Sequence, residues 1–592
     1  MKKNILFAFS LGLGLAFTSC VDLDLNPLSQ ASSGSWNDSP EEIKMSVSDL
    51  FRADLWRTVD EKWTDDEISR NNRNDYINGV LTSQNSDIQS MWIQCYRAIG
   101  RDNSVMEKLL EMGNPGILTQ SEYNQYLGEC YFVRACMYSR LVFHYGDVPY
   151  CDHVVDIETA FSMGRTPKAE VLEHIYGDFE QAAKLLPLQS AAEQRVTKCA
   201  ALGMWARTAL WFSDWDKVIE CTSEIMKLNK ENNLYELYPN FGELFLSSTH
   251  NTKESLFSLA RSVELGLPWD NKWRDFCPRN VSGYATFSPS WQLLAGFLCD
   301  DGLPIDETTT RFDRTDPTKY RDPRCAATIV KFGSTVLGYE YDPNVVTGKE
   351  VTGPAGTQVR NNDNKANSNV ASYNGLIWRK FLDETCTQNN WKTGHDLIIL
   401  RYADVLLMYA EAKIEKNEID ETVLDAMNQV RARAYNNHTF ESDMEHPAPT
   451  FENGDTYPKI TTTNQARLRT LIRYERRMEF ARENNRYYDL IRWGLMDEAL
   501  AGNIYGIFQN KDTILKNMNE TGNWLWAFVP QMDENGLADF SLYETIKDQA
   551  PEPYYGFAYI LQTRTFQDKQ YLWPIPANEV LINDNIKQNP GY

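Results

Sequence analysis

Apolar side chains recur every three or four positions through the first long stretch of the mature chain. In "SDIQSMWIQCYRAIGRDNSVMEKLLEM" this spacing links Ile88, Trp92 and Ile99, and it is the period of one face of an α-helix. The same period continues in the segments that follow. The pattern therefore predicts successive helices over about residues 86–228.

Residues that commonly begin or end helices divide this stretch. Gly146 is a predicted C-cap, because glycine adopts the left-handed conformation that ends many helices. Thr166 and Pro167 predict an N-cap followed by a first-turn proline, and Ser213-Asp214 predicts a break. The helix–turn–helix length is similar to a tetratricopeptide unit, with a degenerate match to that consensus. We expect a mainly α fold on a tetratricopeptide-like scaffold of helix pairs.

Helical periodicity weakens over about residues 235–395. The part from 333 to 395 consists mostly of Asn, Gly, Thr and Lys, with short strand-like pieces such as "GLIWRKFLD". A second irregular stretch covers about residues 504–570. Loops of this length inside a compact domain are usually functional or disordered. We therefore interpret these two stretches as loop-rich insertions.

Helices are predicted again over about residues 396–500. In "HDLIILRYADVLLMYAEAKIEKN", Leu400 and Leu407 fall on one face. Further on, Glu and Arg recur at three- and four-residue spacing from Glu475 to Arg486. Opposite charges at this spacing pair along a helix. We interpret the array as structural rather than catalytic.

The first twenty residues have the features of an export signal. Lys2 and Lys3 precede a short apolar stretch, and a run of small residues ends in Cys20. The apolar stretch is too short for a comfortable membrane span. We predict that residues 1–19 are a lipoprotein signal peptide, that Cys20 carries the lipid, and that residues 20–592 form a single body.

Composition narrows the choice of ligand. The net charge is −23, and an acidic surface repels phosphate backbones, so nucleic acid is a poor candidate. A neutral ligand such as a glycan needs no charge for its binding. The chain also has 16 Trp and 30 Tyr residues, more than a core requires, so some are expected at the surface for binding.

Common catalytic and metal-binding motifs are absent from the sequence. It contains no H-E-x-x-H, G-x-S-x-G, Walker A or G-x-G-x-x-G motif, and none of its 11 cysteines forms a C-x-x-C pair. Cys130, Cys136 and His144 fall in helical patterns, where we interpret them as packing residues. We expect no cofactor, no metal ion and no catalytic residue. The abundance of acidic residues leaves a glycosidase carboxylate pair open.

Four stretches together resemble one known family. They are "ILRYADVLLMYAEA" (399–412), "MNQVRARA" (427–434), "LIRYERRMEFARENNRYYDLIRWG" (471–494) and the terminal "YLWPIP...QNPGY". Their order and spacing are similar to those of the SusD/RagB family of Bacteroidetes outer-membrane lipoproteins. The lipoprotein-like start agrees, and the resemblance extends over nearly the whole chain.

The resemblance implies a fold and a function. Members have tetratricopeptide-like helix pairs as a scaffold and an irregular, loop-rich part that carries the ligand site. They are non-catalytic surface proteins that cover a SusC-type TonB-dependent transporter and capture oligosaccharides, or peptides in some branches. Acidic residues after the lipidated cysteine, here Asp22 and Asp24, accompany export to the outer face of the cell.

A glycan site needs flat aromatic rings for the apolar faces of sugars and a few polar groups for their hydroxyls. Tryptophans in loop-like sequence, with polar neighbours, are the signal for such a site. We predict one approximate cluster and two outlying tryptophans. The cluster is Trp63, Asp65, Asp66, Trp92, Cys299 and Arg379, and the outlying residues are Trp291 and Trp391.

Three functions stay open at this point. The first is capture of a glycan, and the "WTDD" stretch resembles that of fructan-handling members, which makes a fructan one candidate. The second is the peptide-binding branch of the same family, and the third is a surface glycosidase. The apolar terminus, with Trp573 and Ile575, is expected to pack on the helical body and does not discriminate between these functions.

Overall fold

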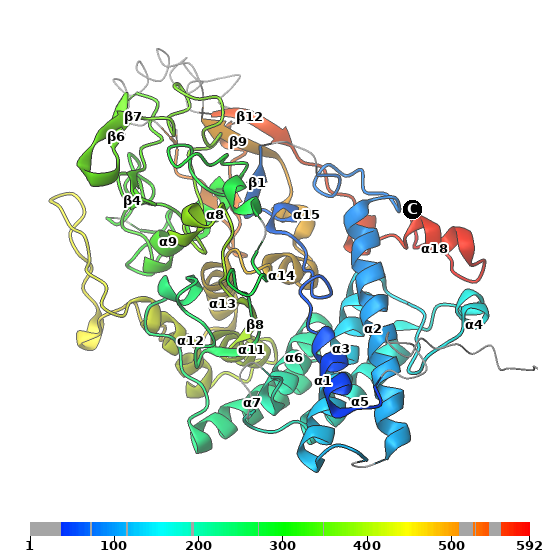
Figure 1. Cartoon of the computed structure of the whole chain (residues 1–592). Helices are drawn as coiled ribbons and strands as arrows, with labels where there is room; N and C mark the ends of the chain where they lie inside the picture. The colour runs from blue at the N-terminus through cyan, green and yellow to red at the C-terminus, as the bar shows by residue number, and fades with distance from the viewer. Residues whose placement is uncertain are drawn as a thin grey trace, which may run out of the picture.

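A computed structural model shows a mainly α-helical molecule with short strands (Figure 1). The predicted signal peptide and Cys20 lie outside the residues that the structure describes. The described residues are 37–70, 74–113, 116–190, 195–269, 271–308, 310–346, 348–507, 525–526, 528–543 and 558–592.

Helices of the first half occupy the lower right of Figure 1, and loops with short strands occupy the upper left. The predicted mainly α fold is confirmed. The helices are α1 (Pro40–Asp49), α2 (Ser86–Met112), α3 (Gln120–Tyr145), α4 (Ile157–Ser162), α5 (Lys168–Leu185), α6 (Lys198–Trp211), α7 (Trp215–Asn232), α8 (Trp291–Gly296), α9 (Pro323–Thr328), α10 (Thr385–Gln388), α11 (Tyr402–Glu415), α12 (Glu421–Ala434), α13 (Gln465–Phe480), α14 (Arg486–Trp493), α15 (Met496–Ala499) and α18 (Ala577–Ile582).

Consecutive helices pack as neighbours in an antiparallel series. Helix α3 packs against α2 and α5, α6 packs against α5 and α7, and α7 packs against α11. Helix α11 then contacts α12 and α13, so the first and second helical regions share one large apolar core. This continuous series is the scaffold on which the loop-rich part rests.

Local signals placed most helix ends correctly. Gly146 caps α3 with φ 75°, and the Asp214 side chain accepts a hydrogen bond from the Lys217 N–H at the start of α7. The start of α5 differs from the prediction, because Pro167 and not Thr166 precedes the first helical residue. Thr166 instead exchanges backbone hydrogen bonds with Val148.

The described strands form six two-stranded antiparallel sheets. The pairs are β1–β3, β2–β8, β4–β5, β6–β7, β9–β12 and β10–β11. The strands are β1 (Glu67–Ser69), β2 (Ser255–Leu259), β3 (Phe287–Pro289), β4 (Thr335–Val336), β5 (Tyr339–Glu340), β6 (Glu350–Thr352), β7 (Gln358–Arg360), β8 (Leu397–Arg401), β9 (Asn503–Ile507), β10 (Gln531–Met532), β11 (Ala538–Asp539) and β12 (Ala558–Thr563).

The loop-rich part has its own smaller apolar cores. One of them contains Trp291, Trp378 and Trp526. The strand-like "GLIWRKFLD" piece does not form a ladder strand, and Trp378 makes only an isolated bridge to Ile329. Its apolar run is buried because it crosses this core, which is why its pattern resembled a strand.

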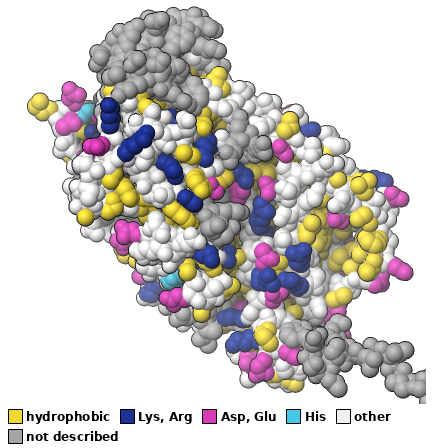
Figure 2. Space-filling model, turned by 45° about the horizontal axis from the view of Figure 1, so that its top comes forward, with side chains coloured by type: hydrophobic (Ala, Val, Ile, Leu, Met, Phe, Trp, Pro, Cys, Tyr) yellow, Lys and Arg dark blue, Asp and Glu magenta, His cyan; other side chains and the backbone are white. Residues whose placement is uncertain are grey.

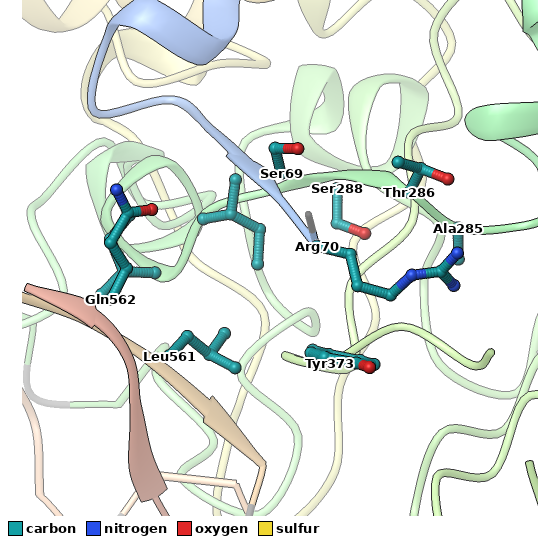
Figure 3. Close-up of a pocket in the computed structure, with 10 residues that line it drawn as sticks. Ser69, Arg70, Ala285, Thr286, Ser288, Tyr373, Leu561 and Gln562 are labelled. Atoms are coloured by element: carbon teal, nitrogen blue, oxygen red, sulfur yellow. The ribbon is translucent and has the colours of Figure 1, made fainter. Parts of the chain in front are cut away.

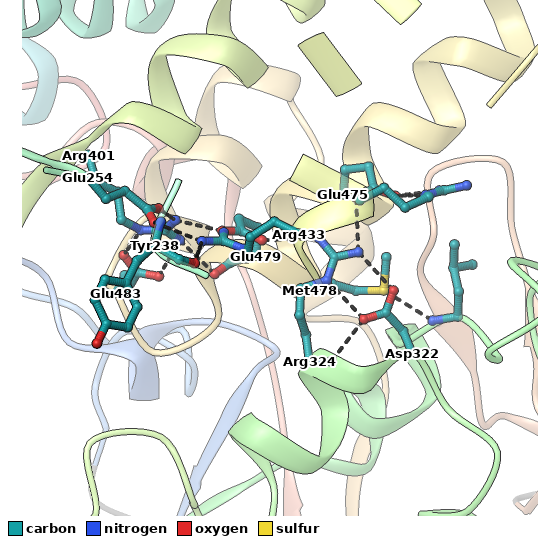
Figure 4. Close-up of polar contacts among 12 residues, drawn as sticks. Tyr238, Glu254, Asp322, Arg324, Arg401, Arg433, Glu475, Met478, Glu479 and Glu483 are labelled. Carbon is teal, nitrogen blue, oxygen red and sulfur yellow. Dashed lines mark hydrogen bonds and ion pairs between the residues drawn. The ribbon is translucent and has the colours of Figure 1, made fainter. Parts of the chain in front are cut away.

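Helix α13 contributes acidic side chains to a buried ion-pair network (Figure 4). Glu479 is bonded by Arg401, Arg433 and Arg324, and Glu475 by Arg324 and Arg431. All these side chains are buried. The charge array is structural, as predicted, but its members pair with other elements rather than along the helix.

The predicted burial of the C-terminal segment is confirmed, since Trp573 and Ile575 are both buried. In Figure 1 the chain ends beside α2, close to α18. Within the described residues, none of the helices is sufficiently long and apolar to cross a bilayer.

Candidate functional site

Six of the eight side chains predicted to bind ligand lie in the core. The prediction required them to be exposed in loops, and that requirement is not met. The buried six are Trp63, Asp65, Asp66, Trp92, Trp291 and Cys299.

The three buried tryptophans each fill a specific place in the packing. Trp63, 3% exposed, stacks on Tyr76 with ring centroids 4.7 Å apart. Trp92 meets Tyr145 edge-on at 5.0 Å. The Trp291 Nε1–H donates to a backbone carbonyl inside the core. Rings enclosed in this way have no free face on which a sugar could stack.

The two aspartates of the "WTDD" stretch serve as buried counter-ions. Asp65 pairs with Arg477 and Arg486, at 2.7 and 2.9 Å, and Asp66 pairs with Arg477 at 2.7 Å. Burial alone would raise the pKa of Asp65, but the two guanidinium groups outweigh it and hold that pKa below its usual value. This stretch fastens α13 and α14 to the N-terminal part, so it offers no exposed group that would favour a fructan.

The other predicted residues are not gathered at one place. Cys299 is fully buried, and its N–H donates to the Leu303 carbonyl. Arg379 is exposed and donates to the Thr335 carbonyl. Trp391 is half-buried. Of the eight, Arg379 and Trp391 therefore remain accessible.

A cavity of about 150 Å³ opens where five segments distant in sequence meet (Figure 3). Strands β1 and β3 form one wall, and β9 and β12 form the opposite wall. This volume is below the roughly 300–1,000 Å³ of sites for drug-sized ligands. It can therefore hold a short segment of a chain, with the rest lying over the surface. The lining residues are Ile68, Ser69, Arg70, Ala285, Thr286, Ser288, Tyr373, Ile504, Leu561 and Gln562.

Tyr373 supplies a flat aromatic ring to this cavity. Figure 3 shows the ring edge-on, below the side chain of Arg70. The Arg70 guanidinium carbon lies 5.9 Å from the ring centroid. Apolar side chains of Ile68 and Leu561 and polar ones of Ser69, Ser288 and Gln562 surround the same space. One flat ring with a few polar groups is the combination that a sugar ring requires.

The loop that carries Tyr373 is held on both sides. The Ile507 N–H donates to the Tyr373 carbonyl at 2.8 Å. The side-chain amide of Asn374 donates to the Pro289 carbonyl at 2.6 Å, and Trp291 donates to the Asn374 carbonyl at 2.9 Å. The predicted residue Trp291 therefore supports the site from beneath rather than touching the cavity.

A second hollow, of about 660 Å³, lies in the segment that follows α12. Its aromatic residues include Phe440, Phe451 and Tyr457. All of its lining comes from residues 432–457, whereas the Tyr373 cavity joins segments from five parts of the chain. A site built from several secondary-structure elements keeps its geometry better than one built from a single loop segment. We therefore favour the Tyr373 cavity as the candidate site.

No group of three or more His, Cys, Asp or Glu side chains within the described ranges is arranged to hold a metal ion. The described residues that line the Tyr373 cavity include no carboxylate. The geometry can bind and orient a ligand through stacking and hydrogen bonds.

Sequence reasoning predicted neither Tyr373 nor Arg70 as a ligand-binding residue. The search favoured tryptophan, and Tyr373 lies in "NSNVASYNGL", a turn-rich run without periodicity. A tyrosine surrounded by small and turn-forming residues was the available signal, because such residues leave a ring uncovered. Nothing local pointed to Arg70, whose neighbours in space lie more than 200 residues away.

Models of two protein families match the chain. The model described as "SusD family" matches residues 253–592. The model described as "Starch-binding associating with outer membrane" matches residues 42–210. Together they cover both the helical scaffold and the loop-rich part.

Individual relatives match over almost their full length. The chain is 24% identical to SusD-like protein P2 of Formosa agariphila, covering 98% of each chain. It is similar to the crystal structure of a SusD-like carbohydrate-binding protein from Bacteroides fragilis, with a TM-score of 0.71, 25% identity and coverage of 93% of this chain and 99% of that one. A second SusD-like structure from Bacteroides fragilis shares the fold, with a TM-score of 0.69, 22% identity and coverage of 95% and 99%.

Proposed function

The chain belongs to the SusD family, and from this premise we propose that it is a glycan-binding protein of the outer membrane that captures oligosaccharides without cleaving them. The observation that carries the proposal is the Tyr373 cavity, where one flat ring faces a few hydrogen-bonding side chains. The relative of known structure that is described as carbohydrate-binding supports it. The starch-binding, outer-membrane description of the model that matches residues 42–210 supports it further.

We also propose a place for the protein in the cell. Residues 1–19 act as the signal peptide and Cys20 carries the lipid. Residues 20–592 form one body that this lipid anchors to the membrane. The ligand is then delivered to a SusC-type TonB-dependent transporter. Affinity purification of the tagged full-length chain from native membranes tests this partnership, and recovery of the lipidated protein without a TonB-dependent barrel contradicts it.

Isothermal titration calorimetry against a panel of oligosaccharides tests the binding function. Tyr373→Ala should weaken binding of a recognised glycan about tenfold, because stacking on the ring is lost. Tyr457→Ala, in the second hollow, is the matched control and should leave the affinity unchanged. If Tyr457→Ala weakens binding while Tyr373→Ala does not, the site is misplaced.

The same panel separates the alternatives. A peptide library replaces the glycans in a second set of titrations, and binding of peptides alone would identify the chain as a peptide-binding member of the family. Chromatography of the glycans after incubation with purified protein detects hydrolysis. Release of shorter products would contradict non-catalytic capture.

A further inference from the structure

Arg70, at the edge of the cavity, is bonded to backbone carbonyls. Its Nη1 donates to the carbonyls of Tyr284 and Val370, at 2.6 and 3.2 Å. In the parts of the chain that the structure describes, no carboxylate forms an ion pair with it. By contrast, Arg477 in the core is bonded to two aspartates. The positive charge of Arg70 is therefore held in place, and none of the described carboxylates neutralises it.

A second cation lies against the same ring. The Lys365 ammonium is 3.6 Å from the Tyr373 ring centroid, and the side chain is only 4% exposed. The ammonium donates a hydrogen bond to the Asn369 carbonyl, at 3.1 Å. Burial, with the nearby charge of Arg70, lowers the pKa of Lys365 to about 8. Both effects act in the same direction, and within the described part of the chain no carboxylate forms an ion pair with this ammonium.

The alternation of rings and cations continues beyond the cavity. The Arg274 guanidinium carbon lies 4.3 Å from the Tyr284 ring centroid and 5.4 Å from that of Trp391. Its Nε donates to the Ser282 carbonyl, and it too forms no ion pair with a described residue. We call these six residues the aromatic–cation strip. Its members are Tyr373, Tyr284, Trp391, Lys365, Arg70 and Arg274.

Three described acidic side chains in segments next to the strip form their hydrogen bonds elsewhere. Glu67 accepts from the Trp378 indole in the core, at 3.0 Å. The Asp363 carboxylate accepts from two backbone N–H groups, and Asp275 accepts from the Thr286 hydroxyl. None of them contacts a cation of the strip. The strip therefore has excess positive charge in a chain whose net charge is −23.

In Figure 2, Lys and Arg side chains intermingle with hydrophobic ones across the upper left of the face. An anion approaching the acidic chain is repelled from most of its surface and attracted where cations lack partners. Guanidinium groups bind carboxylate or sulfate through paired, charge-assisted hydrogen bonds.

We propose that the aromatic–cation strip makes the site selective for acidic oligosaccharides, with sugar rings on Tyr373 and Trp391 and anionic substituents on Arg70 and Arg274. This inference rests on the proposed glycan-binding function and specifies its ligand class. The shared chemistry is an anionic group on a sugar ring, which a uronic acid or a sulfate ester supplies.

Two matched ligand pairs test the selectivity by calorimetry. One is an oligogalacturonate and its carboxyl-reduced neutral form, and the other is a sulfated galactan oligosaccharide and its desulfated form. The anionic member of at least one pair should bind about tenfold more tightly than its neutral form. That preference should shrink as salt is raised from 50 to about 300 mM, since the charges are partly exposed.

Variants connect the preference to the strip. Arg70→Gln and Arg274→Gln keep a side-chain donor but remove the charge, and each should reduce the preference for the anionic form about tenfold. Lys365→Met removes the buried ammonium, and thermal unfolding shows whether this variant still folds. Lys230→Gln, at an exposed position of α7 at the opposite end of Figure 1, removes the same charge and should not change the preference.

The outcomes are distinguishable. Equal or tighter binding of the neutral forms, with loss of binding in Tyr373→Ala, overturns the acidic selectivity and leaves glycan capture standing. A preference for anions that survives both arginine variants also overturns it. Failure of every glycan, neutral or anionic, overturns this inference together with the proposed function.

Discussion

At the scale of single residues, the position of Tyr373 depends on a glycine in the neighbouring strand. Gly506 of β9 lies directly beneath the Tyr373 loop. A Cβ at this position would be 2.7 Å from the Tyr373 carbonyl oxygen and 2.8 Å from the Leu561 side chain. The backbone oxygen cannot move without breaking its hydrogen bond from Ile507. Only glycine allows this strand and the loop to approach so closely.

Gly506→Ala should therefore displace Tyr373 and weaken glycan binding about tenfold or more. Calorimetry with a recognised glycan measures the loss, and thermal unfolding reports the fold. Gly100→Ala in α2 is the control, because a Cβ there has no neighbour within 4 Å. That change should leave binding intact and stabilise the helix by about 0.5–1 kcal/mol. Full affinity in Gly506→Ala would contradict the tight approach.

Another single residue, Glu67, makes stability depend on pH. Burial raises its pKa to about 8, although Arg482 opposes the shift. In the unfolded chain this carboxyl ionises near pH 4.3. Between about pH 5 and 8 the folded state keeps a proton that the unfolded state has lost. The contribution of Glu67 to stability therefore falls as pH rises through this window and levels off above pH 8.

Glu67→Gln should remove that dependence, since the amide is neutral and still accepts from the Trp378 indole. The variant's stability relative to the unmodified protein should rise by up to about 1.4 kcal/mol per pH unit between pH 5 and 8. Urea unfolding at pH 5, 6.5 and 8 measures the difference. Glu231→Gln, at an exposed position of α7, is the control. Parallel pH profiles for the two variants would contradict the raised pKa.

At the scale of elements, α13 is held to the rest of the molecule by charge rather than by apolar contact alone. Glu479 accepts from Arg401 at 2.6 Å, from Arg324 at 3.1 Å and from Arg433. Burial alone would raise the pKa of Glu479, yet these guanidinium groups lower it to about 2. The arginines come from β8, α9 and α12, so this carboxylate links four elements.

Glu479→Gln should cost about 3–5 kcal/mol of unfolding free energy, because it leaves buried guanidinium groups without a counter-charge. Glu307→Gln is the matched control. Its carboxylate also pairs with an arginine, Arg467, but both side chains are partly exposed, so the cost should be below about 1 kcal/mol. Urea denaturation of both variants gives the comparison, and similar midpoints would show that the network does not stabilise the fold.

Helices could be predicted from the sequence because their signals are local. Apolar spacing and caps such as Gly146 act over a few residues and survive folding unchanged. The prediction that Thr166 caps α5 was wrong because a tertiary contact replaces it. The carboxylate of Asp147 accepts a hydrogen bond from the Lys168 N–H at the start of α5. The loop-rich part has no period to detect, and its elements form only where distant segments meet.

The prediction of exposed binding residues was wrong for a related reason. Whether Trp63 or Asp65 is exposed depends on partners that the local sequence does not reveal. The arginines that pair with the buried Asp65 carboxylate are more than 400 residues away along the chain. Composition gave the correct expectation of many aromatic rings but not which of them stays uncovered. Burial of an isolated ring or charge is a property of the whole fold.

At the scale of the whole molecule, the C-terminal segment joins the two helical regions. The Trp573 ring stacks on His144 at 4.0 Å, and its indole donates to the Tyr487 hydroxyl at 2.7 Å. The Asn589 side chain donates to the carbonyls of both Tyr145 and Trp573. This segment thus contacts α3 of the first helical region and α14 of the second, and it closes the scaffold.

Deleting residues 571–592 should lower the melting temperature, because the rings around Trp573 lose their cover. Trp573→Ala removes only the buried ring and should lower the free energy of unfolding by about 3–5 kcal/mol, the usual loss for a buried aromatic side chain. Leu581→Ala in α18 is the control, since that side chain is 79% exposed and its removal should change stability by less than about 0.5 kcal/mol. Differential scanning calorimetry compares all three with the intact chain.

An unchanged melting temperature in the deletion would mean that the segment rests on the scaffold without supporting it. A drop that also abolishes glycan binding would show that closure of the scaffold fixes the Tyr373 cavity, because β12, which forms one of its walls, leads directly into this segment.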